Sequence, residues 1–196
     1  MKNWIGNSNS VFKTLSATNH SDTDREENDY YATDPKALEL LFEYEKFQNV
    51  LEPACGEGHL SETLIKHHIK VSSSDIINRN YGITKDFFNY KKWNGDIVTN
   101  PPYKYALEFV EHALKITPKG SKVAMFLKIQ FLESKKRRKL FIDKPPTKIY
   151  ISSGRLLCAK NGDFEHVKKN GGSAVAYAWY IWEKGFYGDT IIKWFN

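Results

Sequence analysis

Asp-Ile-Val-Thr-Asn-Pro-Pro-Tyr, residues 96–103, contains a short apolar run that stops at two prolines. The run predicts a buried strand over 96–99, which must end there because neither proline has a backbone N–H to donate to a sheet. The turn beyond it presents the amide of Asn100, the carbonyl of Pro101 and the ring of Tyr103. In an open α/β sheet, ligands bind at this carboxyl end of the strands. An amide oxygen and a carbonyl can accept both hydrogens of an exocyclic amine, while the ring stacks on the attached base.

A second informative stretch is the glycine turn Glu-Pro-Ala-Cys-Gly-Glu-Gly at residues 52–58. It lies between a predicted strand over 47–51 and a predicted helix over 59–68. Its glycines allow positive φ and close approach of the backbone to a ligand, and the helix N-terminus favours an anionic group. Asp75 ends the next predicted strand, about 20 residues later, where a carboxylate accepts hydrogen bonds from ribose hydroxyls. Together these features indicate a cofactor that contains adenosine.

Two residues in and just after the glycine turn depart from the dinucleotide-binding fingerprint, and they help to decide which adenosine-containing cofactor binds. Ser61 stands where the dinucleotide fingerprint has a third Gly or an Ala, and Glu57 would place a carboxylate near a pyrophosphate. An extra carboxylate is less unfavourable beside S-adenosylmethionine (SAM), a zwitterion with a sulfonium. The turn therefore favours SAM over a nicotinamide dinucleotide.

Helix and strand patterns alternate along the chain. The predicted helices, which have apolar residues at helical spacing, cover 35–44, 59–68, 106–116 and 133–141. The predicted strands, which are short apolar runs, cover 47–51, 70–75, 96–99, 123–127, 148–151, 174–182 and 190–194. The alternation predicts an α/β fold with a mostly parallel seven-stranded sheet and helices on both faces. We expect the last two strands to form a hairpin across Gly185 and Gly188, which adds an antiparallel edge.

Length and composition indicate one soluble domain. The chain has 196 residues, 41% of them apolar and 27% charged, as in ordinary globular proteins. Residues 1–28 are polar and indicate a mobile arm, and residues 29–196 form the domain. Two cysteines are too few for a disulfide framework, no apolar stretch is long enough to span a membrane, and no signal peptide is visible. We therefore expect a cytoplasmic protein with no membrane partner and no metal site.

Positive charge is concentrated in the second part of the chain. The net charge is +6, but residues 118–196 contain 16 lysines and arginines against 6 acidic residues. Clustered basic residues favour a polyanionic partner such as nucleic acid, and we expect DNA. The basic run over 135–139 can bind phosphates, and Arg155 extends that surface.

These motifs resemble those of class I SAM-dependent methyltransferases, and most closely those of the amino-methyltransferases that modify N6 of adenine in DNA. The fourth motif of these enzymes, Asp/Asn/Ser-Pro-Pro-aromatic, is matched by residues 100–103, and the first motif by residues 51–58. Asp75 matches the ribose-binding acid of the second motif. Residues 86–87, Asp-Phe, match the third motif, which contacts the cofactor's adenine. Residues 31–35 resemble the upstream motif that contacts the methionine part of SAM.

The order of the motifs is that of the gamma group, and the resemblance covers about residues 29–183. It implies the Rossmann-like fold of class I methyltransferases, SAM as cofactor and S-adenosylhomocysteine as product. The SAM-binding residues that it implies are Tyr31, Thr33, Glu52, Pro53, Ala54, Cys55, Gly56, Gly58, Asp75, Ile76, Asp86, Phe87 and Asn100. The catalytic residues that it implies are Asn100, Pro101, Pro102 and Tyr103.

Substrate contacts are expected from a base-stacking ring and from basic side chains. Tyr103 stacks on one face of the base, and Phe164, in the loop before the strand at 174, can stack on the other. The expected phosphate contacts come from Lys135, Lys136, Arg137, Arg138 and Arg155. Relatives with restriction-type specificity carry a separate target-recognition domain, for which this chain has no room. In this respect it is similar to small phage- and prophage-type methyltransferases, and a second copy or a partner protein would supply target recognition.

Several alternatives stay open. The same chemistry can act on adenine in RNA, on N4 of cytosine or on the amide of a protein glutamine. A nicotinamide-dependent oxidoreductase is supported only by the glycine turn and Asp75. A catalytically silent nucleic-acid-binding module is a third class. Binding of SAM rather than NAD separates the methyltransferases from these rivals.

Overall fold

The computed structural model describes residues 31–154, 156, 158–160 and 175–195. The predicted arm, Phe164 and Arg155 lie outside these residues. The helices described are α2 (Pro35–Phe42), α3 (His59–Lys66), α4 (Ala106–Ile116) and α5 (Arg138–Asp143), with short 3-10 helices at Phe87–Asn89, Tyr103–Tyr105 and Ile129–Leu132. The strands described are β1 (Tyr31–Thr33), β2 (Val50–Glu52), β3 (Val71–Asp75), β4 (Ile83–Thr84), β5 (Ile97–Thr99), β6 (Lys122–Lys128), β7 (Lys148–Ser152), β8 (Cys158–Lys160), β9 (Tyr177–Glu183) and β10 (Ile191–Phe195).

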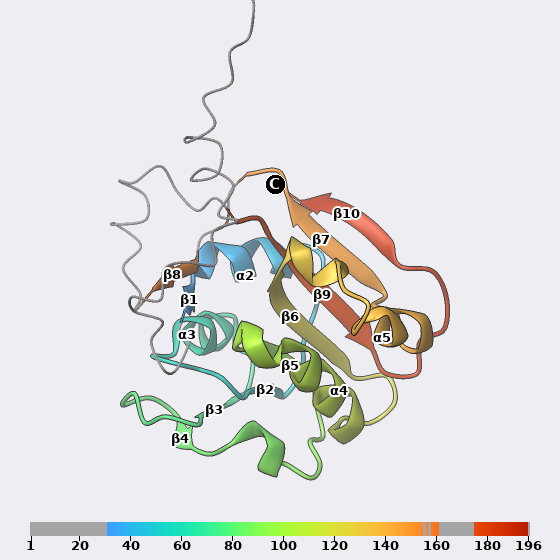
Figure 1. The fold of residues 1–196 in the computed structure, drawn as a ribbon. Coiled ribbons are helices and arrows are strands. Elements are labelled where there is room, and N and C mark those ends of the chain that lie inside the picture. The colour runs from blue at the N-terminus through green and yellow to red at the C-terminus, as the bar shows by residue number, and fades with distance from the viewer. Residues whose placement is uncertain (1–30, 155, 157, 161–174, 196) are drawn as a thin grey trace, which may run out of the picture.

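Eight of these strands form one sheet in the order β10-β7-β9-β6-β5-β2-β3-β4, with β10 and β4 at its edges (Figure 1). Neighbouring strands are parallel except at β9, which is antiparallel to both β6 and β7. The predicted α/β class with a mostly parallel sheet is confirmed. The sheet has eight strands rather than seven because the two-residue β4, whose residues are exposed, adds an edge that no apolar pattern announces.

The predicted hairpin between the last two strands is wrong. Residues 177–182 of β9 are all buried, which suits an interior strand. Both sides of β9 are occupied, by β6 and by β7, so no edge is left beside it for β10. Instead, β10 pairs in parallel with β7, on the side of β7 that is away from β9, and Ile191 lies opposite Lys148.

Two apolar layers cover the two faces of the sheet. Alternate residues of β6 face opposite layers, with Val123 and Met125 in one and Ala124 and Phe126 in the other. The first layer contains buried residues of α4 and α5, and the second contains buried residues of α2 and α3. The prediction of helices on both faces is therefore confirmed (Figure 1). Among the helices of the described residues, none is both long enough and apolar enough to cross a membrane.

The basic helix predicted over 133–141 lies further along the chain, at α5. The hydroxyl oxygen of Ser134 accepts the N–H of Lys136 at 3.2 Å, and the Ser134 carbonyl accepts the N–H of Arg137 at 3.1 Å. These bonds close a turn before the helix begins at Arg138. A serine side chain that bonds the local backbone competes with the helix, and this delays its start.

A separate two-stranded ribbon joins segments that are far apart in sequence. β1 and β8 lie beside α2 (Figure 1). They pair antiparallel, with Thr33 opposite Cys158. No pattern in the sequence predicts this pairing. Its consequence is that Cys158 lies next to the strand that precedes α2.

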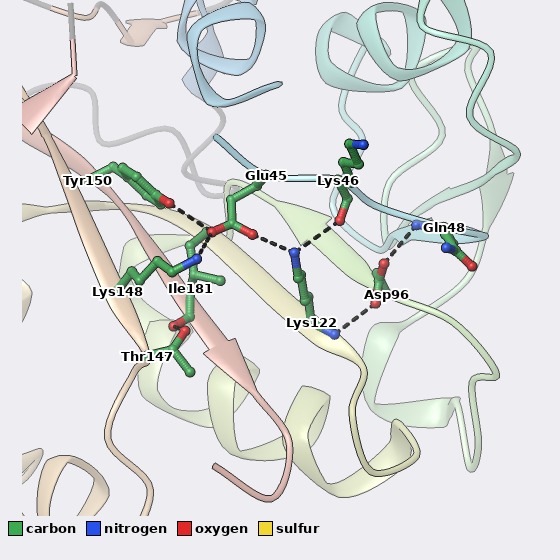
Figure 2. A network of polar contacts seen from close by, with 9 residues as sticks. All are labelled: Glu45, Lys46, Gln48, Asp96, Lys122, Thr147, Lys148, Tyr150 and Ile181. Atoms are coloured by element: carbon green, nitrogen blue, oxygen red, sulfur yellow. Dashed lines mark hydrogen bonds and ion pairs between the residues drawn. The ribbon is translucent and has the colours of Figure 1, made fainter. Parts of the chain in front are cut away.

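The amino ends of β6 and β7 are tied together by a polar network, drawn in Figure 2. The buried carboxylate of Glu45, which follows α2, accepts hydrogen bonds from Lys122 Nζ at 2.5 Å, Lys148 Nζ at 2.6 Å and the Tyr150 hydroxyl at 2.8 Å. Asp96 extends the network, because its two oxygens accept the N–H groups of Lys122 and Gln48, each at 2.7 Å. The buried carboxylates of Glu45 and Asp96 therefore have partners within the protein.

Candidate active site at the carboxyl ends of the strands

A cavity of about 550 Å³ lies where β2, β3 and β5 end. Most of the predicted SAM-binding and catalytic residues line it, namely Tyr31, Thr33, Glu52, Pro53, Ala54, Cys55, Asp75, Ile76, Asp86, Phe87, Asn100, Pro101, Pro102 and Tyr103. The structure thus brings together residues from five separate parts of the chain. Gly56 and Gly58 are outside the lining.

Asn100 follows β5 and has a fixed amide orientation. Its Nδ2 donates to the Tyr31 carbonyl at 3.0 Å and to Thr33 Oγ1 at 2.9 Å, and lies 3.7 Å from Cys158 Sγ. Its Oδ1 is buried, and within the described part of the chain no group donates a hydrogen bond to it. A buried acceptor without a donor is costly, and such groups are rare in folded proteins. Asn100 lines the cavity and therefore carries, beside it, a buried acceptor that the described residues leave unsatisfied.

Tyr103 opens the short helix after the two prolines and lies among other aromatic rings. Its hydroxyl donates to Cys158 Sγ at 3.3 Å. Its ring centroid is 5.8 Å from that of Tyr31 and 6.0 Å from that of Tyr177, and Lys128 Nζ lies 4.5 Å from it. Burial holds the pKa of Tyr103 well above its usual range, so the phenol is neutral at physiological pH. The ring is positioned as part of the cavity wall.

Asp75 ends β3 with its carboxylate held by the backbone. Gly56 N–H donates to Oδ2 at 2.9 Å, and Ile77 N–H donates to Oδ1 at 3.0 Å. A carboxylate has about four acceptor positions, so these two bonds leave capacity for the hydroxyls of a ligand. Gly56 is expected to contact the cofactor, but its backbone N–H instead orients the Asp75 carboxylate.

Gly58 is required by the packing of the chain on itself. Its φ is +91°, and a Cβ there would lie 2.5 Å from the ring of Tyr81. The Tyr81 hydroxyl donates to Glu62 Oε1 at 2.7 Å, which holds that ring over the glycine turn. The glycine spacing correctly indicates a tight turn, but glycine is needed at position 58 because the ring of Tyr81, and not a ligand, lies against it.

Glu52 is fully buried at the end of β2. Burial raises its pKa to about 8, the hydrogen bond from the Ser61 hydroxyl opposes that change, and the negative charge of Asp75 adds to it. Ser61 Oγ also lies 2.6 Å from Ser73 Oγ. Serine at position 61, the departure from the dinucleotide fingerprint, therefore has a structural reason, because it satisfies the buried acid.

Asp86 and Phe87 form one wall of the cavity. Asp86 Oδ1 accepts the N–H of Phe88 at 2.9 Å and so caps the short helix that follows. Phe87 is buried, with its ring centroid 4.8 Å from those of Phe109 and His112. Phe88 and Phe109 line the cavity as well, so the apolar wall is wider than the predicted Phe87 alone.

Sequence reasoning missed part of the lining. The missed residues are Ala32, His59, Leu60, Ile77, Arg79, Phe88, Lys104, Tyr105 and Phe109. Most are close neighbours of motif residues, so widening each motif by a few positions finds them. Phe109 is different, because it reaches the cavity from α4 and only the packing of that helix reveals it.

The predicted phosphate-binding residues of the basic run, 135–138, are outside the lining of this cavity, and Arg155 lies outside the described residues. Lys135 and Arg138 line a second, more open pocket of about 650 Å³ beside α5. Arg137 folds back onto its own chain, where its guanidinium donates to the carbonyls of Phe131 at 2.6 Å and Gln130 at 3.0 Å and to that of Glu133. Arg137 is therefore engaged in holding the turn before α5. Within the described residues, no cluster of three or more His, Cys, Asp or Glu side chains could hold a metal ion.

Comparison with solved structures shows which known proteins share the fold. The chain is similar to PH1948 of Pyrococcus horikoshii, assigned as an RNA methyltransferase, with 13% identity, a TM-score of 0.58, and coverage of 93% of this chain and 100% of that one. It is also similar to a Listeria monocytogenes protein assigned as a class I SAM-dependent methyltransferase, with 14% identity, a TM-score of 0.53, and coverage of 82% of this chain and 62% of that one. A third similar structure is the type IIG restriction endonuclease BpuSI, with 12% identity, a TM-score of 0.52, and coverage of 77% of this chain and 25% of that one.

These likenesses establish the fold, which is the Rossmann-like α/β fold of class I SAM-dependent methyltransferases. The chain spans less than two thirds of the Listeria protein and a quarter of BpuSI. No protein-family profile matches the chain, and no curated protein matches its sequence.

Proposed function

We propose that this protein is a SAM-dependent methyltransferase that transfers a methyl group to an exocyclic amine, N6 of adenine in DNA. The observation that carries the proposal is that Asn100 lines the cavity and that its buried Oδ1 has no donor among the described residues. Its amide nitrogen is committed to β1, so the oxygen is left to accept from a ligand. A donor with two hydrogens, such as an amino group, suits this acceptor beside the Pro101 carbonyl.

The polar groups around the cavity fit SAM. Asp75 retains acceptor capacity for ribose hydroxyls, and Phe87, Phe88 and Ile76 supply an apolar wall for the adenine ring. Glu52, whose pKa is raised to about 8 by burial, is largely neutral at pH 7, so the carboxylate side of the cavity is less negative than its composition implies. When bound, SAM supplies an electrophilic methyl group on its sulfonium.

Asn100 and Pro101 would make the amine a better nucleophile. The lone pair of an adenine amino group is delocalised into the ring. Acceptance of both hydrogens by Asn100 Oδ1 and the Pro101 carbonyl favours a tetrahedral nitrogen, whose lone pair is then available for in-line attack. This is catalysis by positioning and preorganised acceptors, and it needs no covalent intermediate. Tyr103 forms the wall on which the base stacks, and a base in a duplex must leave the stack to reach it.

Charge and similar proteins support a nucleic acid as the acceptor. The second part of the chain is strongly basic, which favours a polyanion. Of the proteins that share the fold, BpuSI is a restriction endonuclease and PH1948 is assigned as an RNA methyltransferase. Because PH1948 is assigned as an RNA methyltransferase, adenine in RNA is the other candidate acceptor. We also propose that a second copy or a partner protein supplies target recognition.

The proposal is tested with SAM labelled in its methyl group and with duplex DNA, single-stranded DNA, RNA and protein as acceptors. We expect label in N6-methyladenine of digested DNA, and a fall of about 10²–10³ in rate for Asn100→Ala. Asn94→Ala is the matched control, because that asparagine is exposed before β5 at the opposite end of the strand. It should leave the rate unchanged.

Three results would change the conclusion. Label only in RNA would replace the acceptor and retain the chemistry. Binding of NAD in place of SAM, measured by calorimetry, would overturn the proposal. Transfer by Asn100→Ala at the wild-type rate would remove the role assigned to the amide.

A further inference from the structure

The β1–β8 ribbon brings a buried cysteine to the motif that carries the proposed chemistry. Cys158 is 7% exposed and begins β8, opposite Thr33 of β1. More than 50 residues of sequence separate it from Asn100 and Tyr103. Only the pairing of β8 with β1 places it beside them.

The sulfur of Cys158 is shared by several polar groups. It accepts the Tyr103 hydroxyl at 3.3 Å and lies 3.7 Å from Asn100 Nδ2. The hydroxyls of Thr33 and Tyr177 interact with it as well. Burial raises the pKa of Cys158 to about 11, so the group is a neutral thiol at physiological pH. A thiol sulfur is a weak acceptor, but here it is the acceptor of a largely buried phenol.

We propose that Cys158 is a positioning residue, whose sulfur fixes the Tyr103 ring and supports the amide orientation of Asn100. Its effect on catalysis rests on the proposed methyl transfer, whereas the contact itself does not. The ring that forms the cavity wall is then held at its hydroxyl end by β8 and at its backbone by the two prolines. Misplacement of a positioned group by about 1 Å can cost 10²-fold in rate, so a weak bond that fixes an angle has a measurable consequence.

The competing explanation is that Cys158 only fills space. Free cysteine is among the most buried residue types and often packs as a small apolar side chain. The two explanations predict opposite orders for two variants. Cys158→Ser keeps an acceptor and loses apolar volume, whereas Cys158→Val keeps an apolar side chain that is slightly larger than that of cysteine, suits a strand and loses the acceptor.

Methyl-transfer kinetics give the first measurement. We expect Cys158→Val to lower kcat about tenfold at an unchanged KM for SAM, and Cys158→Ser to stay within about threefold of wild type. In a Tyr103→Phe background the effect of Cys158→Val should shrink, because residues that act through one bond are not additive. Ile181→Val, a loss of apolar volume in the same layer near the amino end of β7, is the control and should leave kcat unchanged.

A second measurement does not depend on activity. In protein carrying ¹³C at tyrosine Cζ, the hydroxyl exchange rate of Tyr103 can be followed by NMR, with its resonance assigned by its loss in Tyr103→Phe. We expect exchange at least about tenfold faster in Cys158→Val than in wild type, because the hydroxyl loses the sulfur and keeps only its hydrogen bond with Tyr177 among the side-chain partners of the described residues. Wild-type exchange in Cys158→Val, or a kcat higher in Cys158→Val than in Cys158→Ser, would overturn the inference. Faster exchange in Cys158→Val, with no methyl transfer by wild type to any acceptor, would retain the contact and refute the proposed function.

Discussion

Two buried glutamates, Glu45 and Glu52, lie at opposite ends of the sheet and are held in opposite ways. Glu45 is 2% exposed and accepts from two lysines and a tyrosine at the amino ends of the strands (Figure 2). Glu52 is 1% exposed and accepts from the hydroxyl of Ser61 at the carboxyl end. Burial alone would raise the pKa of both groups. The hydrogen bonds from the lysines and Tyr150 lower the pKa of Glu45 below its usual value, whereas the pKa of Glu52 rises to about 8.

The buried carboxylates at the amino ends of the strands are satisfied without a ligand, whereas the buried polar groups at the carboxyl ends are not all satisfied within the described residues. At the amino end, the buried carboxylates of Glu45 and Asp96 are paired with cations or backbone N–H groups. At the carboxyl end, Asn100 Oδ1 lacks a donor among the described residues, and an acid is kept neutral beside a second carboxylate. Perturbed and incompletely satisfied polar groups at a cavity are typical of functional sites. The amino end stabilises the fold, and the carboxyl end is available for chemistry.

The largest effect should follow from removal of the paired carboxylate. Glu45→Ala leaves the Tyr150 hydroxyl and two ammonium groups without their acceptor. We expect the free energy of unfolding to fall by about 3–5 kcal/mol, as for the loss of one partner from a buried ion pair. Urea denaturation at pH 7 measures it.

Glu39→Ala is the matched control, because Glu39 pairs with His67 at an exposed site. An exposed pair contributes about 0–1 kcal/mol. A loss as small for Glu45→Ala as for Glu39→Ala would mean that the network is solvated. The folded pKa of Glu45 is lowered, so its stabilisation is present above the usual value of 4.5 and is lost as the pH falls through the folded pKa. Glu45→Ala should remove that part of the acid sensitivity.

Glu52 should give the opposite pH dependence. Its folded pKa of about 8 exceeds the ordinary 4.5, so the stability linked to its proton is present below pH 4.5 and is lost as the pH rises through about 8. Glu52→Gln keeps an acceptor for Ser61 and cannot ionise. We expect Glu52→Gln to be more stable than wild type at pH 9 by about 2–4 kcal/mol and closer to it at pH 5, in thermal unfolding with calorimetry. An equal difference at both pH values would mean that Glu52 is ionised in the folded protein.

The next effect concerns the ligand rather than the fold. Asp75→Ala removes the carboxylate expected to accept from ribose and leaves Gly56 N–H without its partner. We expect the affinity for SAM to fall by about 1.5–3 kcal/mol, the contribution of hydrogen bonds to a charged group, as measured by titration calorimetry. Asp143→Ala, an exposed change at the end of α5, is the control. Unchanged SAM affinity in Asp75→Ala would remove Asp75 from the cofactor site.

The smallest effect separates two neighbours in the basic run. Arg137→Ala loses the guanidinium bonds to three carbonyls and should lower the free energy of unfolding by about 1–2 kcal/mol. Lys136→Ala changes an exposed side chain, should leave stability within about 0.5 kcal/mol, and should weaken DNA binding at low salt. Unfolding curves and fluorescence anisotropy with a duplex measure the two effects. The reverse pattern would place the phosphate contact at Arg137.

Local sequence patterns specify most of the helices and central strands and the end of the sheet at which the candidate site lies. The prolines at 101–102 end an interior strand, because they lack a backbone N–H to donate to the neighbouring strand. The apolar runs and helical stripes are properties of neighbouring residues, so the predicted bounds of α4 agree with the observed ones, Ala106–Ile116. Parallel strands place their carboxyl ends together, and therefore Asp75, the glycine turn and Asn100 could be assigned to one cavity before the fold was known.

The contacts between distant segments, in contrast, follow from tertiary packing and are visible only in the folded chain. Strand pairing depends on which edges remain open after the rest of the sheet has formed, so the parallel pairing of β10 with β7 has no local signal. The same holds for the ribbon that brings Cys158 to Tyr103, and for the hydroxyl of Ser61 that meets Glu52. Burial and charge pairing are non-local as well. For that reason two glutamates that look alike in the sequence have pKa values displaced in opposite directions.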